Sequence, residues 1–140
     1  METIFTDTFV LNTKGFGDTI DITESVTKAI EKSGIENGLA TVFCPGSTGT
    51  ITTIEYESGV IKDLQEILEK IVPSNVPYEH DKRWGDGNGF SHVRAALMKP
   101  SLSIPCVKGR LSLGTWQQVV FIDFDNRERH REIMVQIMGV

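Results

Sequence analysis

The stretch SLSIPCVKGRLSLGTWQQVVFIDFDNRERHREIMVQIMG, residues 101–139, decides the fold class of this chain. It contains three strand-like runs: SLSIPCV (101–107), QVVFIDFD (118–125) and REIMVQIMG (131–139). Each run either alternates apolar and polar residues or has a β-branched apolar centre, and both patterns are typical of strands. We therefore expect the end of the chain to form strands of a mostly antiparallel sheet.

Earlier in the chain, further runs predict strands for the same reasons. They are the spaced apolar residues Phe5, Phe9 and Leu11, the apolar run LATVFC (39–44), and the Thr/Ile-rich run TITTIEY (50–56). PGSTG (45–49) separates the last two runs and contains the residues of a tight turn. A hairpin is the ordinary interpretation, although its hydroxyls and amides could also serve a ligand.

Two longer segments predict helices. In DITESVTKAIEKSG (21–34), Asp21 and Glu24 form a capping-box pattern and Gly34 is a suitable terminator. The second helix should begin near Ser58 and end before Pro73. Apolar residues at helical spacing define one face of each helix: Ile22, Val26, Ala29 and Ile30 in the first, and Val60, Ile61, Leu64, Ile67, Leu68 and Ile71 in the second.

Residues 73–91 lack periodicity and predict a long loop, which in a compact domain is usually functional or disordered. Ser91 could cap a short helix through HVRAALM (92–98), which must end before Pro100. The sequence thus predicts one α+β domain over residues 1–140. We expect a mostly antiparallel β-sheet packed against two main helices and one short helix.

Composition excludes several classes of protein. The chain has 140 residues, 14 basic against 19 acidic, and a net charge of −5, which disfavours a broad nucleic-acid surface. Neither a membrane helix nor a signal peptide is expected. Cys44 and Cys106 lie in apolar runs far apart in the sequence, so we interpret them as reduced core thiols of a cytoplasmic protein.

The segment YEHDKRWGDGNGFSHVRAAL (78–97) holds the residues best suited to chemistry. Asp81, Asp86 and Asn88 lie between His80 and His92, and two histidines with a carboxylate could hold zinc or iron. Spacing alone favours the alternative, in which one histidine packs and the other is solvated. GDGNG (85–89) could instead cradle an anion with Asn88, Ser91 and Arg94 at the start of the following helix, or it could be a flexible turn.

Weaker candidates lie elsewhere in the chain. Glu55 interrupts a Thr/Ile strand, so its carboxylate either faces solvent or serves a site. Lys108–Arg110 has the residues of a basic turn between strands, and Trp116 in GTWQQ (114–118) could be a ligand floor or an interface anchor. Neither a nucleophile elbow nor a Cys–His nucleophile pair is visible.

The assembly GNGFSHVRAALMKPSLSIPCVKGRLSLGTWQQVVFIDFD (87–125) resembles the YjbQ family, also called the secondary thiamine-phosphate synthase family. YEHD (78–81), PGSTGTITTIEYE (45–57) and VQIMG (135–139) are similar to that family as well, so the likeness covers nearly the whole chain. The resemblance implies an α+β fold that forms a homotrimer, with sites near subunit boundaries. It also implies a metal or anion site built from the family's histidines.

Carried over residue by residue, the resemblance assigns the metal and catalytic roles to His80, His92 and Glu55, as a two-histidine, one-carboxylate set. Arg110, Thr115, Trp116 and Gln117 match the family's GR and GTWQ elements. Many members carry a further histidine that opens an HTSA-like turn. Here Pro45 occupies that place, which resembles a PGSTG subgroup.

Two functions remain open from the sequence. The first is an enzyme of phosphorylated or pyrophosphorylated small metabolites, as thiamine-phosphate synthase activity or phosphoester hydrolysis would be. A divalent metal would polarise the phosphoryl oxygen, and Arg94 or Arg110 would offset developing charge. The second is a non-catalytic homotrimeric module that binds a metal or an anion. Loss of a base at Pro45 favours binding, whereas a carboxylate near both histidines favours chemistry.

Overall fold

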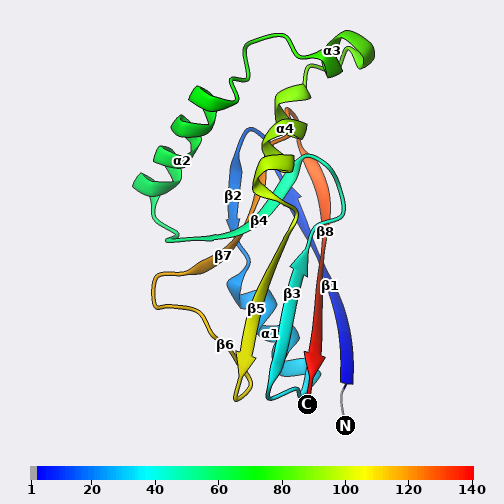
Figure 1. The fold of residues 1–140 in the computed structure, drawn as a ribbon, viewed down its shortest axis with the longest axis vertical. Coiled ribbons are helices and arrows are strands. Elements are labelled where there is room, and N and C mark those ends of the chain that lie inside the picture. The colour runs from blue at the N-terminus through cyan, green and yellow to red at the C-terminus, as the bar shows by residue number, and fades with distance from the viewer. Residues whose placement is uncertain (1–2) are drawn as a thin grey trace.

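Two antiparallel sheets and four helices make up the computed structural model, which describes residues 3–140 (Figure 1). The larger sheet has the strand order β1-β8-β3-β5-β6, and the smaller has the order β2-β7-β4. The strands are β1 (Thr3–Thr13), β2 (Asp18–Asp21), β3 (Gly38–Phe43), β4 (Gly49–Ile54), β5 (Ser101–Val107), β6 (Arg110–Leu111), β7 (Gln118–Asp123) and β8 (Arg129–Gly139). The helices are α1 (Thr23–Ser33), α2 (Ser58–Ile71), α3 (Glu79–Trp84) and α4 (Gly89–Met98).

The larger sheet is organised around β8, which pairs with β1 on one side and β3 on the other. Alternation along β8 buries Ile133, Val135 and Ile137. These side chains share a core with the buried residues Val26 and Ile30 of α1. The inner face of the larger sheet is therefore covered by α1. Alternate residues of a strand lie on one face, and residues three or four apart lie on one side of a helix, so both elements present an apolar side to the same core.

The smaller sheet lies between two cores because β7 is apolar on both faces. Val119 and Phe121 belong to the core of the larger sheet, whereas Val120 and Ile122 pack with Leu68 of α2 and with α4. A strand that is buried on both faces has a continuous apolar sequence rather than an alternating one. This arrangement places α2 and α4 on the far side of the smaller sheet.

The α+β class is confirmed, and each predicted strand and helix is present, but the strands form two sheets rather than one and the sequence did not predict β2, β6 or α3. The capping-box prediction for α1 is wrong in detail, because the N-cap is Ile22 and has no side-chain cap. Asp21 instead accepts hydrogen bonds from the backbone amide and hydroxyl of Thr23, at 3.0 and 2.6 Å. Helix α2 spans the predicted residues, but Leu68 is the only residue in it that is fully buried, and Ile67 and Ile71 are exposed.

PGSTG (45–49) does not close a hairpin. Strand β3 pairs with β5 and β8 in the larger sheet, whereas β4 pairs with β7 in the smaller sheet. The turn therefore carries the chain from one sheet to the other. Local composition predicted a turn correctly, but it could not tell which strands would pair.

Residues 73–91 are more ordered than the predicted long loop. Helix α3 forms within this segment, and α4 begins at Gly89, two residues before Ser91. Figure 1 shows α3 beyond one end of α4, at the opposite end of the molecule from the β5–β6 hairpin. Within residues 3–140, no helix is long and apolar enough to cross a membrane.

Candidate functional site

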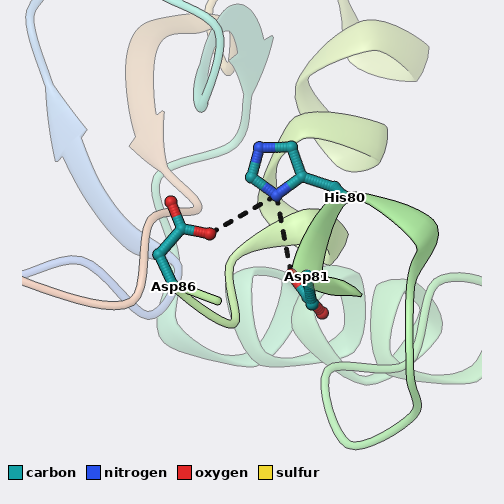
Figure 2. A group of neighbouring side chains, drawn as sticks. All are labelled: His80, Asp81 and Asp86. Atoms are coloured by element: carbon teal, nitrogen blue, oxygen red, sulfur yellow. Dashed lines mark ion pairs between the residues drawn. The ribbon is translucent and has the colours of Figure 1, made fainter. Parts of the chain in front are cut away.

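A compact group of metal-ligating side chains forms where α3 turns toward α4. His80 and Asp81 lie on α3, and Asp86 lies in the turn that follows it (Figure 2). Ligand atoms of these three residues all lie within 4.8 Å of one another. Gly85 and Gly87, with φ of 71° and 69°, reverse the chain so that Asp86 returns to the histidine.

The Nδ1 atom of His80 is the centre of this group. It lies 3.4 Å from a carboxylate oxygen of Asp86 and 3.6 Å from one of Asp81. The atom is buried, yet it makes no hydrogen bond within residues 3–140. A buried polar atom without a partner is costly, so its presence needs an explanation. The Asp86 side chain is 53% exposed, which leaves the group open to solvent on that side.

His92 joins the group from α4. Its ring centroid lies 4.4 Å from that of His80, and the two ring planes are inclined at 37°. The structure thus brings together the two histidines that are twelve residues apart in the sequence. Their proximity follows from the close approach of α3 and α4.

Hydrogen bonds hold the α3–α4 connection in place. The amide of Gly89 donates to Asp81 Oδ1 at 2.8 Å, and Asn126 Nδ2 donates to the carbonyl of Asp86 at 2.8 Å. Gly89 is required here, because a Cβ would lie 2.6 Å from Cβ of Tyr78 and 3.0 Å from Asp81 Oδ1. The carboxylates around His80 are therefore positioned by the backbone and by the β7–β8 turn.

Beneath the site, a buried ionic network ties β7 to β8. Arg131 donates from Nε and Nη2 to the two oxygens of Asp123, each at 2.8 Å. Arg129 donates to Asp125 Oδ2 at 2.8 Å, and Asn88 Nδ2 donates to Asp125 Oδ1 at 3.1 Å. Two carboxylates thus face two guanidinium groups, and the network anchors the start of α4 through Asn88.

The pKa values of Asp125, within this network, and of Cys44, beside it, both depart from their ordinary values. Burial alone would raise the pKa of Asp125, but hydrogen bonds from Asn88, the Asn126 amide and Arg129 outweigh it and lower the pKa. Burial raises the pKa of the Cys44 thiol to about 11, with Arg131 opposing the shift. Cys44 is therefore a neutral thiol at neutral pH, and Cys106 is likewise buried and free.

Asn88 and Ser91 have structural roles that differ from the predicted anion contacts. Asn88 is the N-cap residue of α4 without a side-chain cap, and its amide bonds to Asp125 instead. Ser91 does not cap the helix. It is the third residue of α4, and its hydroxyl donates to the carbonyl of Phe124. Both side chains are buried and fix α4 against the end of β7.

Arg94 is not a free anion clamp in this chain, which corrects the sequence interpretation. It is buried, and its Nε and Nη2 donate to the carbonyl of Val72 at 3.1 and 2.7 Å. Nη2 also donates to Glu69 at 2.9 Å. The guanidinium therefore ties α4 to the last carbonyls of α2, a common use of arginine at a helix C-terminus.

The structure places Glu55 away from the histidines. It follows β4, whose first residue, Gly49, lines a hollow beside His92. Six strand residues at about 3.3 Å each put Glu55 about 20 Å further along. In a single chain, the carboxylates beside His80 are therefore Asp81 and Asp86, and the expected set with Glu55 does not form.

The GR element lies in the β5–β6 hairpin at the other end of the molecule, and the GTWQ residues lie in the connection that returns from this hairpin to β7 (Figure 1). Arg110 begins β6 at the tip of the β5–β6 hairpin, and Trp116 is 70% exposed in the connection to β7. Gln117 accepts from the Gly114 amide at 2.8 Å and so shapes this connection, which also contains Thr115. Within residues 3–140, no hydrogen bond or ion pair joins any of these four residues to the His80 group.

Sequence reasoning noted Asp81 and Asp86 between the two histidines but assigned the carboxylate role to Glu55. The signal was present: Asp81 adjoins the histidine, and Asp86 lies between two glycines that can reverse the chain. It was hidden because residues 73–91 show no helical periodicity, so α3 was not expected. Unless that helix is expected, the spacing of the three residues in the sequence does not indicate that their side chains lie close together.

The comparisons with known proteins agree on one family. A sequence model described as UPF0047 protein YjbQ-like matches residues 7–140. A UPF0047 protein of Methanothermobacter thermautotrophicus is 38% identical over 97% of this chain and 93% of its own length. YugU of Bacillus subtilis, another UPF0047 protein, is 32% identical over 94% of this chain and 98% of its own.

Solved structures show the same fold. A YbjQ-like protein of unknown function from Sulfolobus solfataricus superposes with a TM-score of 0.94 over 100% of both chains, at 28% identity. An uncharacterised YjbQ/UPF0047 family protein from Clostridium acetobutylicum has a TM-score of 0.85 and 37% identity, over 94% of this chain and 98% of its own.

Proposed function

The chain belongs to the YjbQ-like UPF0047 family, and we propose that it uses the group around His80 to hold a divalent metal ion for chemistry on phosphorylated small molecules. One observation carries the proposal. His80 Nδ1 is buried and has no hydrogen-bond partner within residues 3–140, but two carboxylate oxygens lie 3.4 and 3.6 Å away. An ion among these atoms would satisfy all three.

The spacing fits a small divalent ion such as zinc or ferrous iron. Bonds of about 2.1 Å in a tetrahedral arrangement separate neighbouring ligand atoms by about 3.4 Å. The two N···O separations, 3.4 and 3.6 Å, are close to this value. Imidazole and carboxylate are also the ligand types that zinc and iron accept. Three protein ligands leave a further position for water or substrate, on the exposed side of Asp86.

In this function, different residues of the chain have different roles. His80, Asp81 and Asp86 would hold the ion, which would polarise a phosphoryl or carbonyl oxygen when bound. The Gly89 amide keeps Asp81 in position. His92, beside His80, can hold or accept a proton at a substrate oxygen, as imidazoles do near neutral pH.

Metal content tests the first part of this proposal. Untagged protein purified without chelators should contain zinc or iron near one ion per chain by elemental analysis. His80→Ala should lower the affinity for zinc at least tenfold, as should Asp86→Asn. Asp63→Asn removes an exposed carboxylate from α2 and should leave the affinity unchanged. Equal zinc binding by all four proteins would refute the site.

The enzymatic part has its own test. A pyrimidine pyrophosphate and a thiazole phosphate are incubated with metal-loaded protein, and pyrophosphate release is measured. This is the activity that the family resemblance implies. A general acid–base group typically raises a reaction rate by about 10²–10⁴-fold. His92→Gln should therefore lower the rate of pyrophosphate release by about 10²-fold or more while zinc stays bound. Metal binding without turnover of this pair or of phosphoesters would favour the non-catalytic binding module.

One observation favours that second candidate for an isolated chain. Arg94 is occupied by Val72 and Glu69, and Arg110 lies at the opposite end of the molecule, so neither is placed to offset charge beside His80. A homotrimer, which the resemblance implies, could bring Arg110 of one chain toward His80 of another. Assembly is therefore part of the proposed function.

The outer face of the larger sheet supports such an assembly. Three rows of side chains cross β1, β8, β3 and β5 without a charged group: Ile4–Met138–Leu39–Pro105, Thr6–Gln136–Thr41–Ser103 and Thr8–Met134–Phe43–Ser101. Ile4, Leu39, Phe43 and Met138 are exposed on this face. A broad uncharged face with large apolar side chains is typical of a protein interface.

A further inference from the structure

The turn Pro45–Gly49 remains without a role once the fold is known. It is not a hairpin, and it passes between the two sheets next to α4. Gly46 and Ser47 are exposed, whereas Thr48 is buried. A segment that only connects two sheets does not need this composition.

Three successive amides in this turn have no partner. The backbone N–H groups of Gly46, Ser47 and Thr48, here called the turn amides, donate no hydrogen bond to any group within residues 3–140. All three lie outside the strands, so no sheet ladder uses them. Consecutive free amides in a turn form a concave donor site that favours anions.

A guanidinium group lies beside the same turn. Arg131 Nη1 is 3.3 Å from the position that a Cβ on Gly46 would occupy, and apart from chain neighbours no other atom lies within 4 Å of that position. Nε and Nη2 of Arg131 are held by Asp123 and Thr48, whereas Nη1 makes no hydrogen bond within the described chain. Because Gly46 has no side chain, Nη1 can be approached past its Cα.

The turn also borders a hollow that leads to the metal ligands. A cavity of about 260 Å³ is lined by Gly46, Ser47, Gly49, His92, Ala95, Ala96 and Pro100, with no acidic residue among them. His92 lines this hollow and also contacts His80 through its ring. One imidazole therefore connects the hollow to the group proposed to hold the ion.

We infer that the turn is a phosphate-binding cradle, in which the turn amides and Arg131 Nη1 hold the phosphate group of a small molecule next to His92. The charges permit this: Asp123 and Asp125 are balanced by Arg131 and Arg129, so a phosphate dianion meets free donors without net repulsion from the network. The role of the phosphate rests on the proposed function, but its binding needs no metal.

Amide chemical shifts test the cradle in the full chain after removal of metal with a chelator. Inorganic phosphate is titrated at constant ionic strength set with chloride, and ¹H–¹⁵N spectra are recorded. The resonances of the turn amides should shift saturably, with one phosphate per chain, and the His92 ring resonances should follow. Absence of saturable shifts at Gly46, Ser47 and Thr48 would overturn the inference without any mutation.

A matched pair of variants adds specificity. Gly46→Ala fills the space in front of Arg131 Nη1 and should weaken phosphate binding at least tenfold. Gly109→Ala places the same methyl on another positive-φ turn glycine, with nothing within 4 Å, and should bind phosphate within twofold of the parent. Melting curves and spectra show whether each variant is folded. If Gly46→Ala is not folded, the phosphate titration of the unmodified chain alone decides whether the cradle exists.

Asp86→Asn separates this inference from the metal proposal. It should lose zinc affinity but keep phosphate binding at the turn amides. If phosphate binds only to zinc-loaded protein and Asp86→Asn abolishes it, the cradle is wrong while the metal site stands. If the turn amides shift in every protein although none binds zinc, the cradle stands without the metal site.

Discussion

At the scale of single residues, neighbours assign different roles to groups of the same chemistry. Asp86 lies 3.4 Å from an unpartnered histidine nitrogen, whereas Asp125 is enclosed by hydrogen-bond donors. The first can serve a ligand because its side chain is half exposed. The second has its lone pairs occupied, so it contributes to stability and its protonation would be costly.

The pH dependence of unfolding should report the second of these roles. The folded-state pKa of Asp125 is lowered, so its ionised form stabilises the fold fully above the unfolded value of about 3.9, and this contribution is lost as pH falls through the folded pKa. Asp125→Asn should lower the unfolding free energy at pH 7 by about 1.5–3 kcal/mol, the contribution of hydrogen bonds to a charged group. Urea unfolding at pH 7 and at pH 3 measures both effects.

Asp125→Asn should also make the unfolding free energy depend less steeply on pH. Between pH 7 and pH 3, Asp125→Asn should lose less stability than the parent, because it has no carboxylate to protonate at this position. Glu69, whose pKa is lowered chiefly by the Ser74 amide, contributes to the acid response of both proteins equally. Asp63→Asn, on the exposed face of α2, should reproduce the parent curve. Parallel curves for Asp125→Asn and parent would contradict this assignment.

At the scale of elements, α2 is held both by apolar packing of Leu68 against β7 and by a polar tie to α4. Leu68 is the only fully buried residue of α2, and a cavity of about 110 Å³ lies among Ile61, Leu64, Leu68 and β7. Arg94 of α4 compensates by satisfying the Val72 carbonyl at the end of α2. A helix with so little buried surface needs this polar tie to remain in place.

Arg94→Lys should therefore loosen the end of α2. A lysine is a compact donor that cannot reproduce the two bonds to Val72, so the amides of residues 68–72 should exchange with deuterium several-fold faster. The amides of α1 should exchange faster only by the amount that any loss of overall stability causes. Arg83→Lys makes the same replacement at an exposed position on α3 and should leave both unchanged. If Arg94→Lys leaves amide exchange unchanged throughout the chain but weakens phosphate binding, the result would instead support an anion clamp at Arg94.

At the scale of the whole molecule, the proposed site and the β5–β6 hairpin that carries Arg110 lie at opposite ends of one chain (Figure 1). The uncharged outer face of the larger sheet offers a surface through which copies could assemble. If they do, residues that never meet within one chain can meet across a subunit boundary. The oligomeric state is therefore a property on which the proposed chemistry depends.

Sedimentation of a charged variant tests this assembly. Thr41 lies at the centre of the uncharged rows, so Thr41→Lys buries an unpaired charge in the interface and should convert a trimer to monomers. Thr27→Lys introduces the same charge on the exposed side of α1 and should leave the trimer intact. A parent protein that sediments as a monomer at micromolar concentration would contradict the proposal.

The sequence by itself determined the elements whose signal is local. Alternation placed β1 and β8, the continuous apolar run marked β7, and helical spacing marked α1 and α2, because each pattern arises from the period of one element. Motif resemblance identified the family and placed His80 and His92 in one site, and their rings do lie 4.4 Å apart.

Only the tertiary structure decided the partners. It placed Asp81 and Asp86 rather than Glu55 beside His80, and it joined Arg94 to the end of α2. It also sent the 45–49 turn between two sheets instead of around a hairpin. Each outcome depends on which elements become neighbours, and that depends on the packing of residues distant in the chain, which no local period encodes.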